Sequence, residues 1–95
     1  MGIKEATTHL KSELSGLLHS EEMFLESEEE ILEIAINILD TLLMKCISED
    51  GKVTNRIWVK TRFLEVCYKL SKSEYSVIHE ILEKIQDFLA ILEAA

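Results

Sequence analysis

The feature that most constrains the fold is a wide apolar helical segment near the middle of the chain. At about 100° per residue, its apolar side chains cover an arc roughly twice the stripe of about 100° that a helix with one buried face needs. Glu33, Asn37 and Asp40 interrupt it, so it does not match a membrane span of about 20 apolar residues. We therefore expect a central bundle helix that is covered from more than one side. Its apolar residues are Ile31, Leu32, Ile34, Ala35, Ile36, Ile38, Leu39, Leu42, Leu43, Met44, Cys46 and Ile47.

Helical periodicity in the rest of the chain predicts three further helices around this one. We expect helices near residues 3–19, 28–48, 55–70 and 74–93. Short connections make consecutive helices antiparallel neighbours in such proteins. A chain of 95 residues is long enough for one domain with a modest core. The sequence thus predicts an all-α, single-domain, antiparallel four-helix bundle over residues 1–95.

Ser27 marks the expected start of the second helix. It opens the sequence Ser-Glu-Glu-Glu, which matches the Ser-x-x-Glu capping box, and the glutamates lie at the positive end of the helix dipole. The alternative is one uninterrupted helix from Ser20 to Ile47, in which Ser27 is merely exposed.

The later helix boundaries carry turn and capping residues as well. Asp50-Gly51 predicts a turn, and Gly51 suits the left-handed conformation that closes a helix. Thr54 or Asn55 is expected to cap the third helix. Ser73 is expected to cap the fourth.

The chain is acidic, but its charges are segregated along the sequence. The formal net charge is −8. Residues 21–50 carry ten acidic residues and one lysine, whereas residues 51–73 carry six basic residues and one acid. A net charge this negative favours solubility and disfavours non-specific binding to nucleic acid or anionic membranes. We expect the basic segment to lie beside the acidic one, within one chain or across an interface.

The two cysteines indicate a reducing compartment. Cys46 and Cys67 both lie on apolar helix faces, and Lys4 and Glu5 interrupt any signal-peptide core near the start. We therefore expect a cytoplasmic protein with two buried free thiols. A disulfide between the two stays open if their helices pack face to face.

Catalytic and metal-binding patterns are weak. The sequence places no histidine beside either cysteine, and the three glycines are too scattered for a phosphate-binding loop. A di-iron bundle would use Glu-x-x-His, and no histidine has a glutamate three residues before it. His79 and Glu83 share a helix face, which alone is weak support for a metal site. We expect no enzymatic activity, no metal and no cofactor.

The most favoured function is a small, self-associating protein–protein interaction module, with a homodimer as the expected state. Four short helices have more apolar surface than one small core readily covers, and exposed apolar patches mark partner surfaces. The first predicted seam is on the fourth helix, and the second contains the only tryptophan. Trp58 lies off the core stripe of its helix, so it either packs under the Asp-Gly turn or the first helix, or anchors a partner. The predicted interface residues are Ile85, Phe88 and Leu92, and then Trp58, Arg62 and Lys69.

Two other functions stay open. One is a helix-turn-helix or winged-helix DNA-binding protein, in which residues 53–54 form a short strand and the basic segment contacts DNA. Against it, residues 73–79 at the start of the would-be recognition helix contain no Arg or Lys. The other is an acidic decoy that presents residues 21–33 to a basic partner. The DNA contacts would be Lys52, Arg56, Lys60, Arg62, Lys69 and Lys72.

Overall fold

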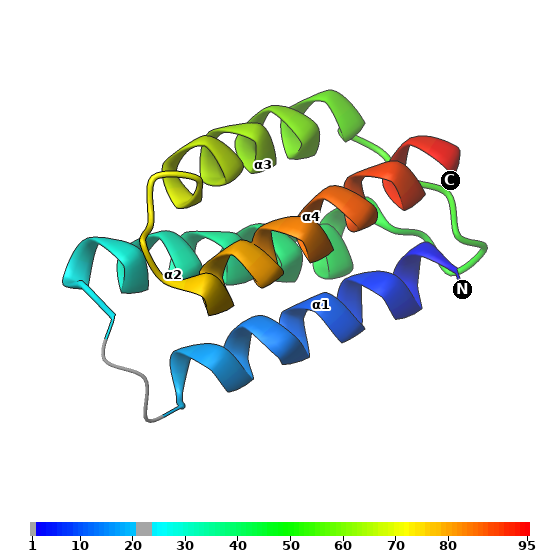
Figure 1. Ribbon diagram of the computed structural model, residues 1–95. Helices are drawn as coiled ribbons and strands as arrows, with labels where there is room; N and C mark the ends of the chain where they lie inside the picture. The colour runs from blue at the N-terminus through cyan, green and yellow to red at the C-terminus, as the bar shows by residue number, and fades with distance from the viewer. Residues whose placement is uncertain (1, 21–23) are drawn as a thin grey trace.

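The computed structural model describes residues 2–20 and 24–95, and it confirms the all-α four-helix bundle (Figure 1). Consecutive helices run in opposite directions, so the two termini lie at the same end. When the π-helical turn after α2 is counted with it, the observed boundaries agree with the predicted ones to within two residues. The helices are α1 (Ile3–Leu18), α2 (Glu26–Thr41), α3 (Arg56–Leu70) and α4 (Ser76–Ala94), and a π-helical turn (Leu42–Cys46) extends α2.

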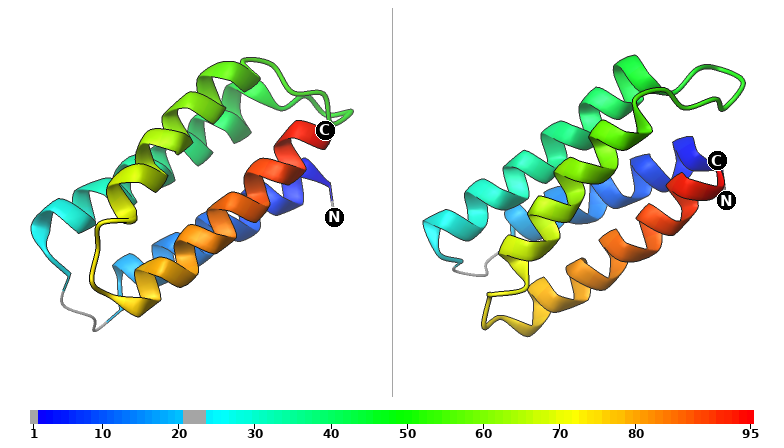
Figure 2. Two further views of the ribbon diagram at one scale, coloured as in Figure 1. Left: turned by 45° about the horizontal axis from the view of Figure 1, so that its top comes forward. Right: turned by 90° about the horizontal axis from the view of Figure 1, so that it is seen from above.

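The four helices form a ring in which each contacts two neighbours. α1 packs against α2 and α4, and α3 packs against the same two helices from the other side (Figure 2). The molecule measures 39 × 22 × 20 Å. Every helix has two neighbours, so burial is shared: α1, α3 and α4 carry five or six buried residues each, and α2 with its π-helical turn carries seven. The expectation that the second helix is covered from more than one side is therefore confirmed, because the wide apolar arc of α2 faces α1 and α3.

Ser27 does not cap α2. The helix begins one residue earlier, at Glu26, and Ser27 is exposed in its first turn. The capping acceptor is Glu28, whose Oε1 accepts a hydrogen bond of 3.0 Å from the backbone N–H of Leu25. Leu25 has extended backbone, so the described part of the connection before α2 is not helical and the uninterrupted helix is also wrong.

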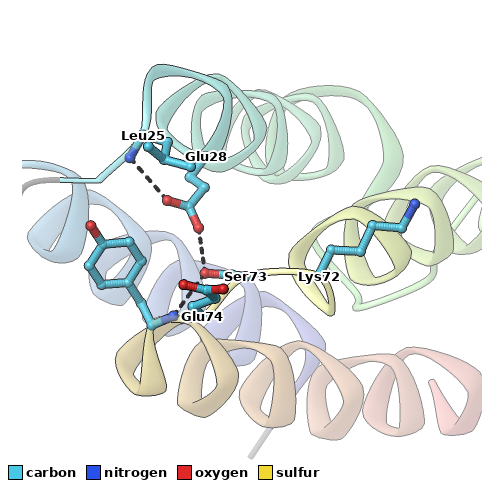
Figure 3. A pocket seen from close by; sticks show the side chains of 6 residues that line it. Leu25, Glu28, Lys72, Ser73 and Glu74 are labelled. Carbon is cyan, nitrogen blue, oxygen red and sulfur yellow. Dashed lines mark hydrogen bonds between the residues drawn. The ribbon is translucent and has the colours of Figure 1, made fainter.

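Glu28 also joins α2 to the loop between α3 and α4 (Figure 3). Its second carboxylate oxygen accepts a hydrogen bond from the hydroxyl of Ser73. Ser73 does not cap α4, which begins three residues later. Its hydroxyl instead accepts a hydrogen bond of 3.2 Å from the backbone N–H of Tyr75. Glu28 is 7% exposed, so this carboxylate is a buried connection between distant segments.

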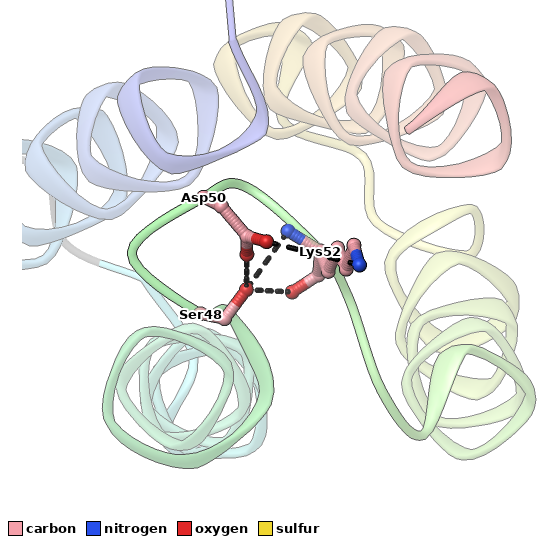
Figure 4. A network of polar contacts seen from close by, with 3 residues as sticks. All are labelled: Ser48, Asp50 and Lys52. Atoms are coloured by element: carbon pink, nitrogen blue, oxygen red, sulfur yellow. Dashed lines mark hydrogen bonds and ion pairs between the residues drawn. The ribbon is translucent and has the colours of Figure 1, made fainter.

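The connection between α2 and α3 is a tight polar loop (Figure 4). The hydroxyl of Ser48 accepts the backbone N–H of Lys52 at 3.0 Å and donates to the carboxylate of Asp50. Gly51 has φ +83°, so the left-handed conformation predicted for it is confirmed. The hydrogen bond from Ser48 lowers the pKa of Asp50, whose side chain is exposed.

The start of α3 follows this loop without a side-chain cap. Asn55 occupies the N-cap position with φ 57°, a left-handed conformation that asparagine tolerates better than most residues. Its amide lies 3.9 Å from the sulfur of Cys46 and makes no capping bond, so the predicted side-chain cap by Thr54 or Asn55 is wrong. Ile47 and Val53 form an isolated antiparallel bridge.

Candidate interaction surface

α3 differs from the other helices because it has apolar residues on opposite sides. Its inner side carries the predicted core stripe, and Phe63 packs edge-on against Phe88 of α4 with ring centroids 5.6 Å apart. The buried residues on this side are Val59, Phe63, Val66, Cys67 and Leu70.

The outer side of α3 carries a second apolar line, which we call the outer stripe and define as Ile57, Thr61, Leu64 and Tyr68. Ile57 is 84% exposed, Leu64 52% and Tyr68 65%. The steps from Ile57 to Leu64 and on to Tyr68 are seven and four residues, about two turns and one turn of helix. Three of the six large hydrophobic residues that are exposed in the described part of the chain therefore share one line on one helix.

Trp58 lies beside the outer stripe, on the side that faces α2. It is 45% exposed, so its predicted position off the core face is confirmed. The groove that it lines is formed with α2 and includes no residue of the Asp-Gly turn or of the first helix. Together with Arg62 it lines a groove of about 250 Å³ against α2, whose other lining residues are Ile34, Asn37, Ile38 and Thr41.

The basic residues of segment 51–73 surround this surface, and several are paired within the chain. Lys60 pairs with Glu93 of α4. Arg62 lies 3.2 Å from Glu65, one helical turn along α3. The side chains of Lys60 and Arg62 nevertheless keep 48% and 41% exposure, so their charge reaches solvent.

The remaining cations lie at the two ends of the outer stripe. At its start, Arg56 donates to the backbone carbonyl of Ala95. At its end, the ammonium of Lys72 lies 4.5 Å from the centroid of the Tyr68 ring. Lys69 forms no ion pair with any described residue. Lys52 lies away from α3, 3.8 Å from Asp50 in the polar loop.

The basic segment lies beside the acidic one within the chain, as predicted, because α3 packs against α2. Among the described residues 24–33, however, no acid forms an ion pair with segment 51–73. The acids that pair with this segment are Glu65 on α3, Glu93 on α4 and Asp50 in the polar loop. Glu21 and Glu22 lie outside the described residues. Glu28 is buried, so the exposed acids of this stretch are Glu26, Glu29, Glu30 and Glu33.

The first predicted seam is wrong. Ile85, Phe88 and Leu92 are 0%, 3% and 1% exposed within a single chain. Their three- and four-residue spacing arises because α4 lies between α1 and α3, and the same spacing serves a bundle core as well as a dimer seam. These three residues are not available to a partner while the bundle is folded.

The segment considered for DNA recognition has a different arrangement. α3 and α4 run antiparallel and side by side, as neighbours in the bundle, whereas a helix-turn-helix crosses its two helices at about 90–120°. Residues 53–54 contribute one isolated bridge and no wing strand within the described chain.

A second group of charged residues joins α1 to α4. Glu13 lies 2.7 Å from His9, one turn away, and 2.7 Å from the ammonium of Lys84 on α4. The hydrogen bond to Glu13 raises the pKa of Lys84 above its usual value of 10.5. His9, Glu13 and Lys84 also line a groove of about 230 Å³ between the two helices. We interpret this group as a link between helices.

Both cysteines are buried free thiols, as predicted, and burial raises the pKa of Cys67. In the described part of the chain no three His, Cys, Asp or Glu residues are grouped as a metal site would require. None of its helices is long and apolar enough to cross a membrane.

Comparisons with protein-family models, with curated proteins and with solved structures found no match. The surface must therefore be interpreted from its own residues. Sequence reasoning found Trp58, Arg62 and Lys69 but missed the outer stripe. The signal was present, because Ile57, Leu64 and Tyr68 lie opposite the core residues of the same helix at helical spacing.

Proposed function

We propose that this protein is a small protein–protein interaction module without catalytic activity, and that the outer side of α3 is its binding surface. The observation that carries the proposal is the outer stripe, in which three large apolar side chains at least half exposed lie along one helix. Exposed apolar residues gathered along one line are typical of a partner site, whereas single exposed residues need no explanation.

The residue types around the stripe support the proposal. Trp, Tyr and Arg are the types most enriched among the residues that dominate binding energy in protein interfaces. Trp58, Tyr68 and Arg62 all lie on the exposed part of α3, and the groove beside Trp58 offers a partner a recess next to the flat stripe.

The absence of catalytic activity in this proposal is supported by the structural roles of several titratable side chains, which hold helices and loops together. Glu13, His9 and Lys84 pair with one another between helices, and Glu28 holds a helix start to a loop. Self-association as a homodimer stays a prediction. Its remaining candidate surface is the outer side of α3, because the seam on α4 is buried.

The experiment compares the wild-type protein with an Ile57→Ser, Leu64→Ser double variant. Both substituted residues are exposed, so we expect circular dichroism and unfolding to change little, within about 0.5 kcal/mol. Met44→Ser is the matched control, because Met44 is 79% exposed but lies on the π-helical turn after α2. Each protein is immobilised and used to capture partners from an extract of its native host, and its molar mass is measured across dilution.

We expect the wild type and Met44→Ser to show the same interaction, and the double variant to lose it. That interaction is either a captured protein or a concentration-dependent increase in molar mass. If the double variant captures and associates as the wild type does, or if no protein shows any interaction, the proposal is wrong.

A further inference from the structure

We infer that the outer stripe docks an amphipathic helix whose flanking residues are acidic. This inference rests on the proposed function and specifies the partner of that surface. It is carried by the juxtaposition of a helically spaced apolar line with basic residues at both of its ends and on both of its sides.

The spacing of the stripe fits another helix. Ile57, Thr61, Leu64 and Tyr68 follow one another at steps of four, three and four residues, which is the spacing of the apolar positions in a coiled-coil seam. At 1.5 Å per residue the stripe is about 16 Å long. A straight apolar line of this length matches two to three turns of a partner helix lying along α3. An apolar residue of that helix opposite the small side chain of Thr61 would find room between Ile57 and Leu64.

The charge around the stripe selects an acidic partner. Arg56 lies at its start, and Lys69 and Lys72 lie at its end. Lys60 and Arg62 project on opposite sides of its middle, and both are about half exposed. Glu65 is the only acid of segment 51–73. Glutamates or aspartates beside the apolar positions of a bound helix would therefore meet Arg56, Lys69 and Lys72 at the ends of the stripe. Beside its middle they would share Lys60 and Arg62 with Glu93 and Glu65 of this chain.

A second copy of this chain fits the stripe less well. An antiparallel copy would place Arg56 of one chain near Lys69 and Lys72 of the other, and a parallel copy would place each cation beside its own equivalent. Like charges opposed in an interface cost free energy and suppress that pairing. An anionic membrane is also disfavoured. The net charge is −8 and segment 51–73 contributes +5, so the rest of the chain carries −13 and would be repelled.

The test uses two labelled synthetic helical peptides as probes and a third labelled peptide as a control. Each is about 20 residues long, because isolated helices shorter than about 12–15 residues are marginally stable in water. Both carry leucine at the two apolar heptad positions. One has glutamate at every flanking position, and the other has lysine there. A third peptide has the composition of the glutamate peptide in scrambled order, so it has the charge without the apolar line.

Binding of each peptide to the full chain is measured by fluorescence anisotropy. We expect the glutamate peptide to bind at least about tenfold more tightly than the lysine and scrambled peptides. Raising the salt from about 0.05 M to 0.5 M should weaken it, because exposed charges are then screened. Leu64→Ser should weaken binding about tenfold or more, whereas Met44→Ser should not. Lys69→Glu breaks no ion pair within the described chain. It should weaken the binding of the glutamate peptide and strengthen the binding of the lysine peptide.

Other results would overturn the inference. Equal binding of the glutamate and scrambled peptides would indicate charge alone, and binding unaffected by Leu64→Ser would place the contact elsewhere. Binding of the chain to anionic phospholipid vesicles that is lost in Leu64→Ser, with no peptide binding, would identify a lipid surface instead. If partner capture or molar mass depends on Ile57 and Leu64 but the glutamate peptide does not bind, the interaction surface stands and only its acidic helical partner is wrong. If neither assay responds to these residues, both proposals fail.

Discussion

The buried carboxylate of Glu28 offers the sharpest test of how this bundle is held together. It accepts the backbone N–H of Leu25 at 3.0 Å and the hydroxyl of Ser73, so it links the start of α2 to the loop before α4. We expect Glu28→Ala to destabilise the protein by about 2–3 kcal/mol. A hydrogen bond to a charged group contributes about 1.5–3 kcal/mol. The total stays below twice that range because Leu25 is exposed and Ser73 half-buried, so water reaches the groups left behind.

Further variants at the Glu28–Ser73 junction show how much each hydrogen bond contributes to the free energy of unfolding. Glu28→Gln keeps an acceptor for Leu25 and a donor for Ser73 but loses the charge, so we expect a cost of about 1 kcal/mol. Ser73→Ala removes the donor to Glu28 and the acceptor for Tyr75, at about 1–2 kcal/mol. Because the two side chains contact each other, the double variant should cost less than the sum by about 1 kcal/mol. Ser27→Ala is the control and should cost under about 0.5 kcal/mol.

Urea unfolding followed by circular dichroism at the helical band measures the wild type and all five variants. Trp58 fluorescence provides a second probe, and coincidence of the two transitions checks for two-state behaviour. The reasoning would be refuted if Ser27→Ala cost as much as Glu28→Ala. It would equally be refuted if Glu28→Ala and Ser73→Ala were strictly additive, because their side chains would then not interact in solution.

Three further predictions concern the core, the link between α1 and α4, and the thiols. Phe63→Ala should cost about 3–5 kcal/mol in urea unfolding, because a fully buried ring leaves a cavity; a cost under 1 kcal/mol would contradict its burial. Glu13 raises the pKa of Lys84, so this pair contributes stability below pH 10.5 that is lost as pH rises through the folded pKa of Lys84. Lys84→Ala should therefore lower the urea midpoint at neutral pH, and its difference from the wild type should shrink at higher pH; a difference that did not change up to pH 12 would refute the pairing. Cys46 and Cys67 should react with iodoacetamide much more slowly in the folded protein than in urea, as mass spectrometry would show, since both are buried and burial raises the pKa of Cys67.

The sequence was sufficient to predict the helices and their order, because each has an apolar stripe at helical spacing and the connections contain turn residues. It was not sufficient for the caps. Ser27 and Ser73 have the right side chains at plausible positions, but the acceptor that pairs with Leu25 is Glu28, whose position depends on a loop 45 residues away. Which polar group closes a helix end is decided by the tertiary neighbours of that end, and a local motif does not contain them.

Tertiary neighbours also decide which apolar residues are available to a partner, and the sequence does not show those neighbours. The long apolar line of the fourth helix favours it as the interface, and the third helix comes second only because Trp58 lies off its core stripe. In the bundle the apolar line of α4 is buried against α1 and α3. The apolar residues of α3 lie on two sides of the helix, so Ile57, Leu64 and Tyr68 stay exposed to solvent. A helix with apolar residues on one side and polar residues on the other buries its apolar residues in the core of its own bundle. Local departures from that pattern are expected at functional sites. The helix that breaks the pattern, α3, is therefore the better candidate for contact with another protein.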